Sequence, residues 1–70
     1  MSVYKNMRHD MINYLQSMMD DFNINRAAYG DDDRIVLKKL DAMIACKEMV
    51  EAIIGEPVNL QMDGKVTIGF

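Results

Sequence analysis

The chain has 70 residues, of which half are hydrophobic, and a formal net charge of −3 at pH 7. A domain this short buries a modest part of its surface and usually needs disulfides, a metal or oligomerisation for stability. The single cysteine excludes an internal disulfide framework, and with one histidine it supplies too few soft ligands for a zinc site. We therefore expect residues 1–70 to form one small domain that binds no metal or cofactor and associates with itself.

The composition also bears on location and partners. We expect a soluble, cytoplasmic protein, because the N-terminal residues lack the apolar run of a signal peptide and no segment reaches the ~20 apolar residues of a membrane span. A lone cysteine at a helical core position fits a reducing compartment. The acidic balance argues against nucleic acid as a partner, because nucleic-acid binding requires a basic face.

The first predicted element is an amphipathic helix over about residues 3–22. Its apolar side chains recur at steps of three and four, as the seam between two packed helices requires. This stripe consists of Tyr4, Met7, Met11, Tyr14, Leu15, Met18 and Phe22. The opposite arc is polar, so one face of this helix should be buried and the other solvated.

Residues 23–31 are expected to connect the two helices, with at most a short helical turn inside them. Asn23, Asn25 and Gly30 favour turns. Ile24 and Tyr29 should then pack against the end of the helical hairpin.

A second helix is predicted over about residues 32–54. The aspartates at 31–33 supply an N-cap and first-turn carboxylates that complement the helix dipole. At the other end Gly55 offers a left-handed cap and Pro57 prevents continuation.

This second helix has two apolar faces. The main face consists of Val36, Leu37, Leu40, Met43, Ile44, Val50 and Ile54. A second face, rotated by roughly a quarter turn on a helix of 3.6 residues per turn, consists of Ile35, Ala42, Cys46, Met49 and Ile53. A helix so widely apolar must be covered on more than one side. We therefore expect the second face to form an oligomer interface, unless the C-terminal hairpin covers it.

Lys47 and Glu51 interrupt the main apolar face one turn apart. Two interpretations remain open. Both side chains can extend past the edge of the first helix into solvent, or they can form a charged pair that sets the register of the oligomer interface.

The C-terminal residues alternate at period two around a turn, which predicts strands over about 58–61 and 65–69. A two-residue turn would mix polar and apolar side chains on each face. A three-residue loop of Met62, Asp63 and Gly64 keeps the apolar pairs on one face and gives Gly64 the left-handed position after a type I turn. The expected fold is thus α+β, a helical hairpin followed by an antiparallel β-hairpin.

The side chains capable of catalysis do not form a set. His9 and Ser17 share the polar arc of the first helix but lie two turns apart, and the pattern gives Cys46 no charged partner. The glycines are scattered rather than grouped as in a phosphate loop. We therefore predict no catalytic residues and no enzyme activity.

Acidic residues gather where the helical hairpin turns. Because Asp20 and Asp21 end the first predicted helix and the next aspartates begin the second, a helical hairpin should bring these acids to one pole of the molecule. The acids concerned are Asp20, Asp21, Asp31, Asp32 and Asp33. They form either a solvated, capped loop or a contact for a basic partner, and a calcium site fits poorly because the ligand spacing of an EF-hand is absent.

These observations favour a non-enzymatic interaction protein that forms a homodimer or higher oligomer and binds another protein as an inhibitor, regulator or assembly subunit. Small size, acidic balance and a missing catalytic set are typical of accessory proteins from phages and mobile elements. The eight methionines fit either core filling or an adaptable partner surface. The alternative function is an oligomer that sequesters a nucleotide or metabolite between subunits, for which Arg8, Arg26 and Tyr29 are the candidate ligand-binding residues.

Overall fold

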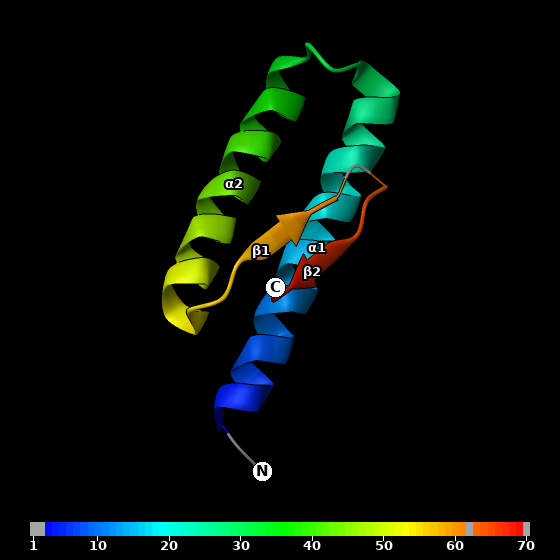
Figure 1. Ribbon diagram of the computed structural model, residues 1–70. Helices are drawn as coiled ribbons and strands as arrows, with labels where there is room; N and C mark the ends of the chain where they lie inside the picture. Colours follow the sequence, from blue (N-terminus) through cyan, green and yellow to red (C-terminus); the bar gives the residue numbers. More distant parts are fainter. Residues whose placement is uncertain (1–2, 62, 70) are drawn as a thin grey trace.

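Two antiparallel helices lie side by side, and a two-stranded hairpin crosses one face of the pair (Figure 1). This arrangement comes from a computed structural model that describes residues 3–61 and 63–69, with only the backbone of residues 3–5. The expected positions of the Tyr4 side chain and of Met62 therefore lie outside the described residues. The molecule is elongated, 42 Å long and 18–19 Å across. The predicted α+β fold, a helical hairpin followed by a β-hairpin, is confirmed.

Helix α1 spans Val3–Tyr29, so the expected break after residue 22 is wrong. Of the asparagines that favoured a turn, Asn25 bonds within the helix and Asn23 lies against the hairpin. The Asn25 amide donates to the Asp21 carbonyl at 2.7 Å, one helical turn earlier, and Asn23 lies beside Gly64 in the β-turn. The helix ends only at Gly30, whose φ of 95° is left-handed.

Helix α2 spans Arg34–Ile54, close to the predicted range. Asp33 is the N-cap: its Oδ1 accepts from the backbone amides of Ile35 and Val36 at 2.9 and 3.3 Å. Gly55 closes the other end with a φ of 78° and donates to the Glu51 carbonyl. Both caps follow from the residue types that satisfy helix termini.

The hairpin has the predicted register. Strand β1 (Val58–Leu60) pairs antiparallel with β2 (Val66–Ile68), and Leu60 lies opposite Val66. Beyond the strands Gln61 donates to the Lys65 carbonyl at 2.9 Å, which leaves three residues in the loop. Gly64 has a φ of 93°, so its predicted left-handed conformation is confirmed.

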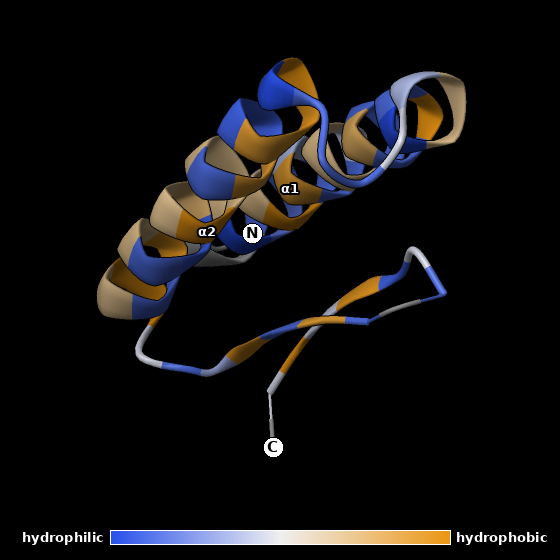
Figure 2. Cartoon of the chain, turned by 90° about the horizontal axis from the view of Figure 1, so that it is seen from above, coloured by the Kyte–Doolittle hydropathy of each residue, from blue (hydrophilic) through white to orange (hydrophobic). Residues whose placement is uncertain are grey.

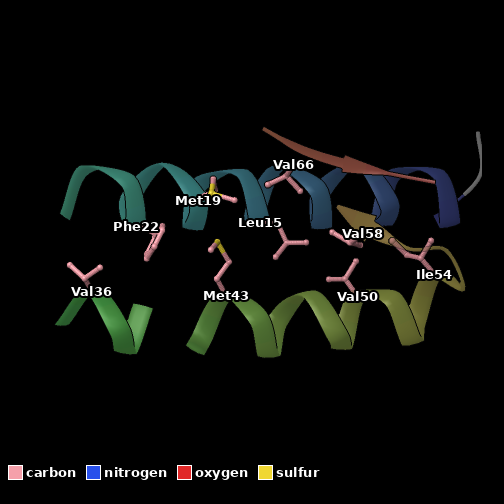
Figure 3. Packing of buried hydrophobic residues seen from close by; sticks show 9 residues of the cluster. All are labelled: Leu15, Met19, Phe22, Val36, Met43, Val50, Ile54, Val58 and Val66. Atoms are coloured by element: carbon pink, nitrogen blue, oxygen red, sulfur yellow. The ribbon is translucent and has the colours of Figure 1, made fainter. Parts of the chain in front are cut away.

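One hydrophobic cluster joins the helices to the hairpin (Figure 3). Leu15 is fully buried, and the valines of both strands pack over the seam between the helices. The buried residues are Leu15, Met19, Phe22, Val36, Met43, Val50, Ile54, Val58 and Val66. Viewed along the layers, the hairpin covers only one side of the helix pair (Figure 2).

Several apolar residues expected inside are exposed. Tyr14 is 62% exposed although it lies on the predicted stripe. Ile24 and Tyr29 were expected to pack against the hairpin end, but the longer α1 carries them past the last core residue, and they are 68% and 63% exposed. On α2, Leu37 and Ile44 are exposed at the edge of the main face.

Replacing Gly64 with alanine is expected to destabilise the fold by about 1 kcal/mol or more, because an L-residue is strained at positive φ. The new Cβ would also lie 3.1 Å from Asn23 Nδ2. A urea melt measures the change. Gly30→Ala is the control, since that glycine has a similar φ but no atom within 4 Å of a new Cβ. Equal losses in the two variants would show that the contact with Asn23 contributes nothing.

Candidate functional site

The hairpin is fastened to the helices by side chains that bond to its outer edges. On the β2 edge, Gln16 of α1 accepts from the Val66 amide at 3.0 Å and donates to the Gly64 carbonyl at 2.7 Å. Toward the hairpin its amide thus supplies one donor and one acceptor, as a neighbouring strand would. The β2 edge is therefore partly occupied.

The β1 edge is fastened by Glu51 of α2. Its Oε2 accepts from the Val58 amide at 2.9 Å, and its Oε1 accepts from Lys47 at 3.1 Å. The Val58 hydrogen bond first, and Lys47 second, hold the pKa of the Glu51 carboxyl below its ordinary value. Both carboxylate oxygens are engaged within one chain, so Lys47 and Glu51 are explained without a role at an interface.

Glu51 should make the hairpin sensitive to acid. Because its pKa is lowered in the folded state, its stabilisation is fully present above the pKa of the unfolded chain. That stabilisation is lost as pH falls through the folded pKa. The denaturation midpoint of Glu51→Gln should lie below that of the wild type at pH 7, and the gap should narrow toward pH 3. Glu48 is an exposed neighbour, so the difference in midpoint between Glu48→Gln and the wild type should not change in this way with pH. If that difference narrows as much as the one for Glu51→Gln, the Glu51 contacts are not the cause.

A third contact fastens the hairpin side near the start of α1. Arg8 pairs with Glu56, with Nε 3.1 Å from Oε2. The side of the helix pair that faces the hairpin is therefore occupied by contacts within the chain. So are the backbone amides of Val58 and Val66 on the two strand edges. The opposite side of the pair remains as the candidate site.

We call this opposite side the far face. In an α-helix residues three and four apart share a side. The residues of the far face lie on the side of α1 opposite Gln16 and on the side of α2 opposite Glu51. Tyr14, Met49 and Ile53 are 62%, 55% and 47% exposed. The far face consists of Met7, Met11, Tyr14 and Met18 on α1 and of Ile35, Ala42, Cys46, Met49 and Ile53 on α2. It contains all five residues of the predicted second apolar face of α2.

The far face is hollowed between the helices. A groove of about 510 Å³ is lined mainly by apolar side chains, with Asn6 and Asp10 at its margin. Tyr14 from α1 and Cys46 and Met49 from α2 line it together, so side chains of both helices face this groove. An apolar surface of this kind is suited to contact with another apolar surface.

The five predicted acidic residues do not form one cluster. Because α1 continues to Tyr29, Asp20 and Asp21 lie about 12 Å, at 1.5 Å per residue, before the helix end. Asp21 pairs with Lys39 and Asp20 accepts from Gln16, while Asp33 is the N-cap. Asp31 lies 3.8 Å from Arg26, and Asp32 is exposed in the connecting loop.

The three candidate ligand-binding residues are also dispersed. Arg8 and Arg26 are about 27 Å apart along α1, at 1.5 Å per residue. Arg8 is paired with Glu56, and the Arg26 guanidinium lies 5.4 Å from the Phe22 ring centre. Tyr29 is exposed near the end of α1. Within the described residues, no group of three or more histidine, cysteine or acidic side chains is placed to hold a metal ion.

The sequence interpretation missed Gln16, which it placed on the solvated arc. Two signals pointed to it. A two-stranded hairpin needs partners at its edges. Gln16 also lies one helical turn from Ile12 and Met19, which pack in or against the core, so its long amide can reach the hairpin.

Comparisons with protein-family models, with curated proteins and with solved structures found no match to this chain. Across the described part of the chain, neither helix combines the length and the apolar character needed to cross a membrane.

Proposed function

We propose that this chain is a non-enzymatic cytoplasmic interaction protein that associates with itself through the far face. As an oligomer it binds another macromolecule, most simply another protein, as an inhibitor, regulator or assembly subunit. The observation that carries the proposal is the exposure of Tyr14, Met49 and Ile53 on one continuous face. A contiguous apolar surface of this kind is typical of protein–protein interfaces.

Two further observations support this choice of surface. The strand edges, the other common sites of self-association, each have a backbone amide bonded to a helix side chain. The core of one chain is also small, with nine buried hydrophobic residues among those described, so association would add apolar burial that a short domain lacks.

Sedimentation equilibrium at micromolar concentration tests the proposal. We expect a mass of at least twice the 8.0 kDa of one chain. Ile53→Glu, which places a charge on the far face, should shift the population toward monomer by at least about tenfold in dissociation constant, the effect of about 1.4 kcal/mol. Ile24→Glu is the matched control, because Ile24 is exposed outside the far face. A wild-type species of one chain mass would overturn the proposal.

The groove favours one second candidate, an oligomer that sequesters a small molecule. Its volume of about 510 Å³ lies in the range of small-molecule sites. The apolar lining suits an apolar metabolite better than a nucleotide, whose phosphates need basic groups. Mass spectrometry of a solvent extract from natively purified protein decides this: a stoichiometric small molecule supports sequestration, and an empty extract argues against it.

A further inference from the structure

We infer that the far face is occupied by a second copy of this chain, related to the first by a two-fold axis parallel to the helices. In this dimer α1 of each copy lies on α2 of the other, and a four-helix bundle forms with one hairpin on each outer side. The inference rests on the proposed self-association and adds its geometry.

The spacing of the far face is that of helix packing. On α1 the residues Met7, Met11, Tyr14 and Met18 follow steps of four, three and four. On α2 the residues Ala42, Cys46, Met49 and Ile53 follow the same steps. This alternation is the seam of bundled helices. Because each helix also packs on its neighbour through the core, each carries two seams, as a helix in a four-helix bundle does.

Two copies can place their far faces together in two ways, with α1 on α1 of the partner or with α1 on α2 of the partner. The charges at the edge of the face distinguish these two dimers. From the 3.6-residue period of the helices, the outer rim of the far face carries Asp10 and Asp21 on α1 and Lys38 on α2. Lys39 of the same chain pairs with Asp21, so among the described residues Asp10 is the acid of this rim without a cation from the far face of its own chain. If α1 packed on α1 of the partner, the two acidic rims would meet and repel. If α1 packs on α2, Asp21 of one copy, which is already paired with Lys39 of its own chain, gains Lys38 of the other copy as a second cation. Electrostatic complementarity therefore selects the second arrangement.

The heights of the exposed side chains along the helix axes agree with this arrangement. A two-fold axis parallel to the helices leaves the height of every residue unchanged. Asp21 pairs with Lys39, so in these antiparallel helices Tyr14 and Met49 lie within about 5 Å of the same height, at 1.5 Å per residue. Each therefore comes close to the other's counterpart across the interface. Tyr14 of each copy lies against Met49 of the other, so the two are covered together, with a favourable sulfur–aromatic contact.

Disulfide trapping tests the geometry. In a Cys46→Ala background, Ser17→Cys on one preparation and Ala42→Cys on a second provide single thiols on α1 and α2. Both positions are exposed. Ser17 lies on the outer side of α1 next to the far face, and its neighbour Met18 shares a hollow with Ala42, so the two thiols lie at similar heights along the helices. After mixing and oxidation with oxidised glutathione, we expect a covalent dimer of one Ser17→Cys chain with one Ala42→Cys chain. Neither preparation alone should cross-link to the same extent.

The outcomes separate failure of the geometry from failure of the proposed function. Cross-linking of the Ser17→Cys chain with itself, or a dimer that yields no mixed disulfide, would overturn the geometry while leaving self-association intact. A monomer in sedimentation would overturn both.

A charge reversal gives an independent measurement. Lys38→Glu should weaken the dimer about tenfold at low salt by placing an acid beside Asp21 of the partner copy, and the loss should shrink as salt rises. The matched control Lys65→Glu makes the same change of charge on the exposed hairpin turn. Equal weakening by both variants would count against the proposed rim pairing.

Discussion

Leu15→Ala is expected to destabilise the fold by about 2–5 kcal/mol, because it removes a fully buried side chain and leaves a cavity. A 70-residue domain has roughly 4–10 kcal/mol of stability in total, so this loss is a large fraction of the whole. Leu15 lies at the centre of the cluster, between both helices and the hairpin (Figure 3). A thermal melt followed by circular dichroism should show a much lower midpoint.

The control for Leu15 is Leu37→Ala. This leucine is 47% exposed, so its truncation should change stability by about 1 kcal/mol or less. Comparable losses at the two positions would contradict the buried position of Leu15 in the core.

Gln16→Ala is the second substitution with a large expected effect, about 2 kcal/mol. It removes the partner of the Val66 amide and of the Gly64 carbonyl, and each partly buried polar group left without a bond costs about 1–3 kcal/mol unless water replaces the partner. Hydrogen exchange should show faster exchange of the Val66 amide, and urea denaturation should show the loss of stability.

Gln61→Ala is the matched control for Gln16. Gln61 is exposed and its side-chain bond reaches only the Thr67 hydroxyl at 3.3 Å, so its loss should be within about 0.5 kcal/mol. If the Val66 amide exchanges at the wild-type rate in Gln16→Ala, the edge contact does not protect the strand.

Features set by local chemistry could be predicted from the sequence. The Asp33 cap, the Gly55 cap and the three-residue loop each depend on neighbouring residues. The end of α1 could not be predicted in the same way. Asn23 favours a turn by itself, and its place against Gly64 depends on a hairpin more than 30 residues away.

The candidate site was predicted only in part, because the apolar pattern of one helix separates two faces and that of the other does not. The second apolar face of α2 followed from helical periodicity, and its residues lie together on the far face. The contribution of α1 was obscured, because Tyr14 and Leu15 are neighbours on one apolar stripe but differ completely in exposure, 62% against 0%. Which edge of a stripe faces the partner helix depends on the rotation of the helices, and a period alone does not fix that rotation.

The fastening of the hairpin has a consequence for the order of folding. Gln16 bonds to Gly64 and Val66 across 48 and 50 residues of sequence, whereas the helices connect through a short loop. A two-stranded hairpin is marginal alone, so strands β1 and β2 gain most of their stability from a helix pair that already exists. Closing a long loop is slow compared with forming a helical hairpin. We therefore expect the helices to assemble first and the C-terminal strands to dock last, onto the surface that the helix pair forms.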